Sequence, residues 1–90
     1  MATTLNGLAY TYMYTADYVK ALATIDEAIA LAPEDADLYD SKGEILLAQG
    51  NDEGALAMWR KVLELNPDIL KDYPDGTVLS NGLKQKGLIE

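Results

Sequence analysis

Two prolines, Pro33 and Pro67, lie 34 residues apart, and each ends a helix-favouring stretch with periodic apolar residues. The two stretches, residues 20–33 and 54–67, align without a gap and are identical at five of fourteen positions. The identical pairs are Ala21/Ala55, Leu22/Leu56, Ala23/Ala57, Leu31/Leu65 and Pro33/Pro67. A fixed period of this size is typical of chains built from stacked repeats, in which each unit buries its apolar face against the next. We therefore expect two copies of one helical unit.

Both stretches have the apolar spacing of a helix. The residues that recur every three or four positions are Leu22, Ile25, Ile29 and Ala32 in the first stretch and Leu56, Trp59 and Leu63 in the second. This period places them on one face of an α-helix, whereas a strand would alternate every second residue. A further helix is predicted before each stretch, over residues 4–14 and 36–48. The expected caps are Asp17, Asp35 or Asp37, and Asn51 at helix starts, and Gly50 at a helix end.

These two units resemble the tetratricopeptide repeat (TPR) family. The resemblance is carried by Leu5, Leu8, Ala9, Tyr12, Ala21, Ile25, Ala28 and Pro33 in the first unit, and by Tyr39, Gly43, Leu46, Ala55, Trp59, Val62 and Pro67 in the second. Lys42 departs from the family pattern, which usually has Leu there, and is expected to lie half exposed with its aliphatic stem on the surface. The resemblance implies an all-α fold, a right-handed superhelical array of two helix-turn-helix repeats at residues 2–34 and 35–68.

The remaining residues, 69–90, do not continue the pattern as a full third repeat. A third unit would begin near Leu70, but Pro74 lacks the helical amide and disfavours helical backbone at Tyr73. Residues 75–86 again have helical spacing and are predicted to form a capping helix over the apolar edge of the last repeat. The whole chain, 1–90, is thus expected to be a single TPR domain. Its tail resembles the C-terminal part of larger bacterial TPR proteins, so the chain is expected to be a fragment of such a protein.

The chain is strongly acidic. It has 15 Asp and Glu against seven Lys and Arg, which gives a net charge of −8. Nucleic acids and anionic membranes are bound mainly through Lys and Arg, so neither is an expected partner. Neither a signal peptide nor an apolar run long enough to span a bilayer is recognised, and the localisation is left open, cytoplasmic if the chain is complete. Basic or neutral protein partners remain.

Catalytic groups are scarce in this sequence. It has no His and no Cys, and no Ser near a plausible base, which excludes imidazole-based and nucleophilic catalysis. The acidic run Glu34, Asp35, Asp37, Asp40 and Glu44 lacks the turn glycine and the third oxygen ligand of a calcium-binding loop. It is interpreted as a capped helix start with a solvated face, and no metal or cofactor is predicted. The expected function is non-enzymatic protein interaction.

The resemblance to TPR proteins implies that the first helix of each repeat lines a concave groove. The residues expected there are Asn6, Tyr10, Met13 and Tyr14 from the first repeat and Asp37, Asp40, Glu44 and Leu47 from the second. Aromatic and Met side chains beside carboxylates suit a peptide or helix with basic and apolar groups. The positions that clamp an acidic tail in TPR proteins are here Asn6, Tyr10, Ser41, Lys71 and Asp75. Because only Lys71 preserves that chemistry, an acidic tail is not expected.

Two alternatives remain open. Tyr10 and Tyr14, four residues apart on one helix face, would in the first alternative merely cover an exposed N-terminal face of the domain. In the second, the apolar edge around Leu5, Leu8 and Tyr12 would be buried by another copy of the chain, giving a weak homodimer that acts as a structural scaffold. The sequence does not specify the identity of the partner.

Overall fold

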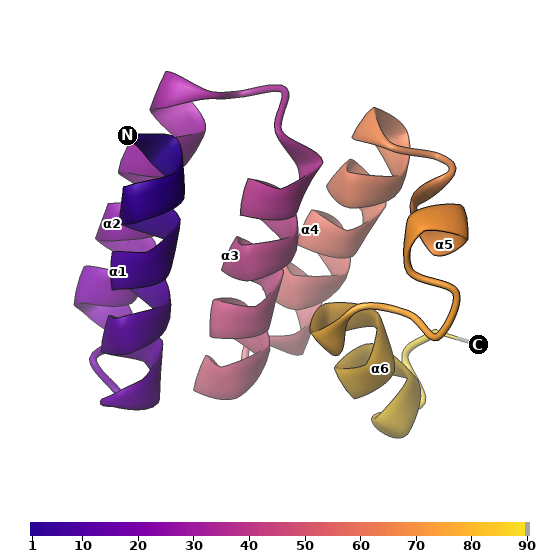
Figure 1. The fold of residues 1–90 in the computed structure, drawn as a ribbon. Helices are drawn as coiled ribbons and strands as arrows, with labels where there is room; N and C mark the ends of the chain where they lie inside the picture. The colour runs from indigo at the N-terminus through magenta and orange to yellow at the C-terminus, as the bar shows by residue number, and fades with distance from the viewer. Residues whose placement is uncertain (90) are drawn as a thin grey trace.

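The structure is all-α. The computed structural model describes residues 1–89, and within this range six helices follow one another without any strand (Figure 1). Their bounds are α1 Ala2–Tyr14, α2 Tyr18–Leu31, α3 Ala36–Gln49, α4 Asp52–Leu65, α5 Ile69–Asp72 and α6 Val78–Gln85. The predicted helices 4–14 and 36–48 are confirmed as α1 and α3, with α1 beginning two residues earlier and α3 ending one residue later. No helix formed by residues 1–89 is long and apolar enough to cross a membrane.

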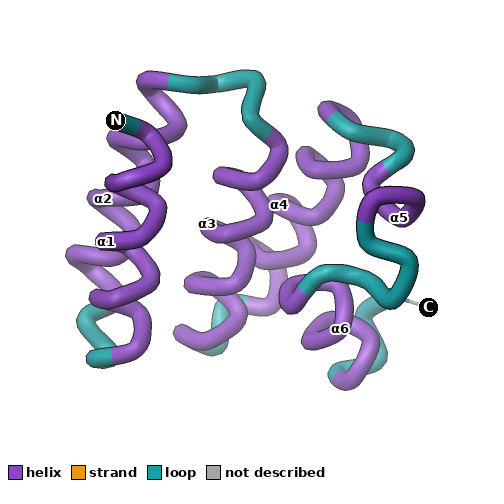
Figure 2. The backbone as a smooth tube through the Cα atoms, in the orientation of Figure 1, coloured by secondary structure: helices purple, strands orange, loops and turns teal. Residues whose placement is uncertain are grey.

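The helices are arranged as two hairpins followed by a shorter C-terminal segment. Helices α1 and α2 pack against each other, α3 and α4 do the same, and α2 and α3 join the two hairpins (Figure 1). Short loops connect the helices within each hairpin, and a longer loop leads from α2 to α3 (Figure 2). Helix α6 packs against both α3 and α4 at the end of the array opposite α1. The fold is therefore a linear array of helical repeats.

Two clusters of buried apolar side chains hold the array together. The first consists of Ala9, Ala21, Ile25, Ala28, Leu38 and Ile45, and the second of Leu46, Ala55, Trp59, Val62, Ile69, Leu79 and Leu83. Leu22 is half-buried and packs against both clusters, so the two cores are continuous. Trp59, which lies on the apolar face predicted for residues 54–67, is 5% exposed and belongs to the core. Large aromatic side chains of this kind contribute strongly to stability because they remove extensive apolar surface from water.

The turn inside the first hairpin is repeated in the second at an offset of 34 residues. Asp17 caps α2 by accepting a hydrogen bond from the Lys20 amide, and Asn51 caps α4 by accepting one from the Gly54 amide. Before each cap lies a residue with left-handed backbone, Ala16 (φ 61°) in the first turn and Gly50 (φ 90°) in the second. In both turns the amide of the capping residue donates to the carbonyl oxygen five residues earlier, from Asp17 to Tyr12 at 2.9 Å and from Asn51 to Leu46 at 2.8 Å. The predicted caps Asp17, Asn51 and Gly50 are confirmed, and of the two candidates for α3, Asp35 is the residue that caps it.

Lys42, the departure from the family pattern, lies where α3 faces α2. Its side chain is 25% exposed, and its Nζ atom is 2.6 Å from Asp26 Oδ1 on α2. The expected half-exposed position is confirmed, and the ion pair adds an interaction between the two hairpins that a Leu could not make.

One predicted boundary in the C-terminal segment, the start of the last helix, is wrong. The third repeat does break at Pro74, since α5 is a single turn that ends at Asp72. The last helix, however, begins at Val78 and not at Asp75, because Gly76 has left-handed backbone (φ 91°) and Thr77 caps the helix. The Thr77 side chain accepts from the Ser80 amide while Ser80 Oγ accepts from the Thr77 amide, which forms a reciprocal capping box. The predicted tail 69–90 is described as far as residue 89.

Helix α6 lies against both helices of the second repeat, not only against the outer face of α4. Its buried face consists of Leu79, Ser80 and Leu83. Gly43 of α3 leaves room for Leu79, and Gly82 of α6 leaves room for Leu47, because a Cβ atom at either glycine would meet the neighbouring leucine. The capping helix therefore lies beside α3, and one side of α6 borders the groove.

The repeated turn generates a prediction about stability. Replacing Gly50 by Ala should lower the free energy of unfolding by about 1 kcal/mol, because an L side chain is strained in left-handed backbone. Ala16→Gly should raise the free energy of unfolding by about 0.5 kcal/mol, the relief of strain being partly offset by a more flexible unfolded chain. Urea denaturation measures both changes.

Gly7→Ala is the matched control, since Gly7 lies in the right-handed backbone of α1 and, like Gly50, has open space where a Cβ would project. It should stabilise the chain by about 0.5 to 1 kcal/mol through helix propensity. Destabilisation by Ala16→Gly would contradict the repeated turn.

Candidate partner-binding groove

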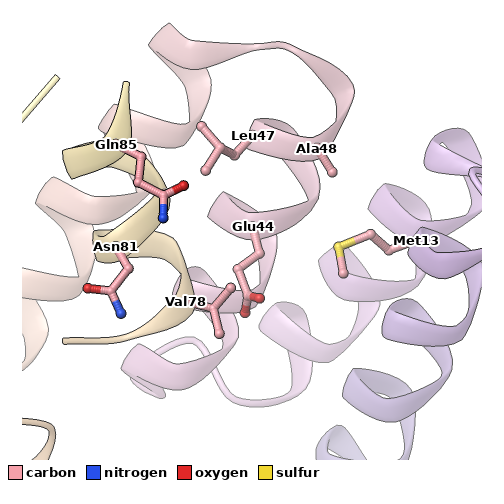
Figure 3. Close-up of a pocket in the computed structure, with 8 residues that line it drawn as sticks. Met13, Glu44, Leu47, Ala48, Val78, Asn81 and Gln85 are labelled. Carbon is pink, nitrogen blue, oxygen red and sulfur yellow. The ribbon is translucent and has the colours of Figure 1, made fainter. Parts of the chain in front are cut away.

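A groove runs between α1, α3 and α6 and contains two adjoining pockets. The acidic pocket, of about 380 Å³, is lined by Asn6, Tyr10, Asp37, Asp40, Ser41, Glu44, Tyr73, Gly76, Thr77 and Val78. The apolar pocket, of about 430 Å³, is lined by Met13, Glu44, Leu47, Ala48, Val78, Asn81, Gly82 and Gln85. Glu44 and Val78 line both pockets, so the two form one continuous surface. In Figure 3, Met13 projects from α1 toward Glu44 on α3, and α6 supplies Val78, Asn81 and Gln85 on the other side.

The structure brings seven of the eight residues predicted for the groove to this surface. Asn6, Tyr10, Asp37 and Asp40 line the acidic pocket, Met13 and Leu47 line the apolar pocket, and Glu44 lines both. Tyr14 lines neither pocket and is 80% exposed, although its ring stacks on that of Tyr10 with 6.4 Å between centroids. The placement shows that these side chains share one surface, and their role in binding stays a prediction.

A hydrogen-bond network at Tyr10 joins the first repeat to the second across the groove. The Tyr10 hydroxyl on α1 donates to Glu44 Oε2 on α3, and the Ser41 hydroxyl lies 3.0 Å from the Tyr10 oxygen. Burial and the neighbouring Glu44 carboxylate raise the pKa of the Tyr10 hydroxyl above its usual range. Burial also raises the pKa of the Glu44 carboxyl, although the hydrogen bond from Tyr10 partly opposes this rise. Tyr10 therefore makes a defined contact between α1 and α3.

A second contact ties the last helix to the acidic pocket. The Thr77 hydroxyl, at the start of α6, donates to Asp40 Oδ1 at 2.9 Å. Burial raises the pKa of the Asp40 carboxyl from its ordinary 3.8 to about 6, against the opposing effect of the Thr77 hydrogen bond. Burial and the charges of Asp35 and Asp72 raise the pKa of Asp37 as well. At neutral pH the pocket therefore contains ionised carboxylates whose charge is incompletely solvated.

Positive charge is missing from the lining of this groove. Among the described residues that line the two pockets there is no Lys or Arg. Lys71, the one residue that keeps the chemistry of an acidic-tail clamp, is exposed and lies 3.6 Å from Asp68 outside both pockets. The groove of the described chain thus combines negative charge at one end with apolar side chains at the other. Within residues 1–89, no group of three or more acidic side chains is arranged to hold a metal ion.

Helix α6 contributes to the groove, which was not predicted from the sequence. Val78, Asn81 and Gln85 form a wall opposite Met13, and Tyr73 and Thr77 border the acidic pocket. Val78 does not join the buried face of the capping helix, and its side chain is 70% exposed at the groove. Gly43 and Gly82, each inside a helix, are the sequence signal for a close helix contact beside α3, but a glycine does not identify the residue that packs on it.

The proposed dimer edge is only partly exposed. Leu5 and Tyr12 are half-buried and pack against the first core cluster, and Leu8 is 42% exposed. Association through this edge stays a prediction.

The fold and the groove define the chain as an all-α helical repeat protein, and comparison with known proteins identifies the repeat. The family model described as tetratricopeptide repeat matches residues 2–35 and 36–69, so the chain belongs to the TPR family. TPR repeats are non-enzymatic and generally mediate protein–protein interaction. Over 57 residues, 63% of this chain, the sequence is 40% identical to a protein named Protein STIP1 homolog from Dictyostelium discoideum. The chain spans 10% of the length of that relative.

The raised pKa of Asp40 generates a prediction about pH and stability. Between about pH 4 and pH 6 the folded chain holds this proton more tightly than the unfolded chain, so this group lowers the free energy of unfolding as the pH rises through that window. Asp40→Asn should therefore stabilise the protein at pH 7 by about 1 kcal/mol, after allowance for partial solvent screening, and have little effect at pH 4. The amide can still accept the Thr77 hydrogen bond.

Urea denaturation at pH 4 and pH 7 checks this difference. Glu27→Gln, which removes an exposed carboxylate from α2 outside the groove, is the matched control and should show a smaller dependence on pH. An Asp40→Asn variant that is less stable than the parent at pH 7 would show that Asp40 is not under a desolvation penalty.

Proposed function

We propose that the groove between α1, α3 and α6 binds a peptide or helix of a partner protein that carries basic and apolar side chains. The observation that carries the proposal is the position of three carboxylates, on Asp37, Asp40 and Glu44, next to an apolar pocket in a groove whose described lining has no cation. A partner with basic and apolar groups complements both halves of this surface.

The three carboxylates of the groove favour a cationic partner on energetic grounds. Burial raises the pKa values of Asp37, Asp40 and Glu44, which means that each ionised carboxylate has lost part of its hydration. A Lys or Arg side chain brought close to them would favour the ionised form and offset that loss. A further carboxylate would instead be repelled, and this argues against an acidic peptide in the groove.

The apolar pocket supports the second half of the proposal. Met13 and Leu47 are half-buried, and Val78 is exposed between the two pockets. Met side chains adapt to partners of different shape because their unbranched chains have several accessible rotamers. An apolar side chain of the partner would remove this surface from water and add to the affinity.

The test is an amide-shift titration of the labelled protein with a basic amphipathic peptide and with an acidic peptide of the same length and apolar content. The basic peptide should perturb Tyr10, Met13, Asp40 and Glu44 at lower concentration than the acidic one. Asp40→Lys should weaken binding of the basic peptide by about tenfold, because it reverses a charge in the pocket.

Glu27→Lys reverses a charge on the exposed side of α2 and is the matched control, with an expected change of less than about twofold at moderate salt. Tighter binding of the acidic peptide, or perturbations confined to α2 and α4, would show that the site lies elsewhere or has the opposite sign.

A further inference from the structure

The acidic pocket has a buried hydrogen-bond acceptor without a partner. Asn6 Oδ1 is shielded from solvent and has no hydrogen-bond partner among the described residues, and Asn6 lines the same pocket as Asp37 and Asp40. A buried acceptor that makes no hydrogen bond loses the hydration it would have in water and gains nothing in return. Because this oxygen is shielded, a ligand donor in the pocket would reach it once the Asn6 side chain rotates, and that contact would supply the missing bond.

Three hydroxyl groups of the pocket already direct their protons to protein oxygens. Tyr10 donates to Glu44, Thr77 donates to Asp40, and the Ser41 hydroxyl lies 3.0 Å from two acceptors, the Tyr10 oxygen and the main-chain oxygen of Asp37. Each hydroxyl has one proton to donate. The pocket is therefore rich in oxygens that can accept a further hydrogen bond, and these hydroxyls have no proton left for a ligand acceptor.

The acceptors come from two helices that face each other across the pocket. Asn6 lies on α1, whereas Asp37 and Asp40 lie on α3. A guanidinium group has five N–H donors in a rigid plane and can donate in several directions at once, whereas an ammonium group is a compact and strongly hydrated point charge. We infer that the acidic pocket is a subsite for an arginine side chain of the partner and that it discriminates arginine from lysine.

The apolar pocket sets the position of a second side chain in the same partner. Asp40 and Leu47 are seven residues apart on α3, which corresponds to about 10 Å along the helix axis. An extended segment advances about 3.3 Å per residue, so an apolar side chain about three residues from the arginine reaches the apolar pocket. This inference rests on the proposed function, since it names the side chain that the same groove recognises.

The experiment uses a set of acetylated and amidated octapeptides with leucine at the sixth position and glycine, serine or alanine elsewhere. The third position is arginine, lysine or citrulline. Citrulline keeps the shape of arginine but has no charge. The dissociation constant of each peptide is measured by amide-shift titration of the full chain at low salt. The arginine peptide is expected to bind about fivefold more tightly than the lysine peptide and at least about tenfold more tightly than the citrulline peptide.

Substitutions in the pocket test which acceptors are used. Asn6→Leu should reduce the preference for arginine over lysine to about twofold or less, because it removes the unpartnered acceptor without changing the net charge. Asp40→Asn should reduce the preference for arginine over citrulline. Glu27→Gln, outside the groove, should leave both preferences unchanged, and thermal melts of each variant show whether it is folded.

The outcomes separate this inference from the function on which it rests. Equal binding of arginine and lysine, both tighter than citrulline, would overturn the arginine subsite and leave a basic-peptide groove intact. Equal binding of arginine and citrulline would overturn the role of charge in the pocket. Failure of all three peptides to perturb the groove, while the longer basic amphipathic peptide does, would also overturn the subsite, whereas failure of every basic peptide would overturn the proposed function itself.

Discussion

The packing of α3 between its neighbours is the constraint on which the rest of this structure depends. This helix contacts α1 and α2 on one side and α4 and α6 on the other. Leu38 and Ile45 belong to the first core cluster and Leu46 to the second, so one helix closes both cores. With these faces committed to packing, the acidic residues of α3, Asp37, Asp40 and Glu44, lie on the strip that faces the groove. The helix that holds the array together therefore also places the half-buried Asp40 near the buried Glu44, and the charge of Asp40 adds to the effect of burial in raising the pKa of Glu44.

The groove carboxylates are held by hydroxyl groups and not by cations. Tyr10 reaches Glu44 from the first repeat, and Thr77 reaches Asp40 from the start of α6. Burial raises the pKa of both carboxyl groups, and the hydrogen bonds, which fix the orientation of each carboxylate, offset that rise only in part. A positively charged partner would interact with these carboxylates and offset the hydration that they lose by burial in the free protein. Relief of that desolvation penalty would contribute to the binding free energy.

Much of this arrangement could be predicted from the sequence because the signals are local. The 34-residue period, the helical spacing and the caps Asp17 and Asn51 depend on neighbouring residues, and they predicted four helices and one wall of the groove. The other wall depends on contacts between residues distant in sequence. Composition and spacing alone do not show that Gly43 admits Leu79 or that Thr77 starts a helix facing Asp40, so α6 was predicted as a cap and not as a lining element.

The most direct test is a carbon-detected NMR titration of the side-chain carboxyl groups, with and without the arginine octapeptide. If Asp40 is partly desolvated and lacks a cationic partner, its pKa in the free protein should lie near 6, well above the ordinary 3.8, and should fall when the peptide binds. Binding should then strengthen as the pH rises from 5 to 7. A pKa near 4 in the free protein, or one that the bound peptide leaves unchanged, would contradict the account of the groove as an uncompensated acidic site.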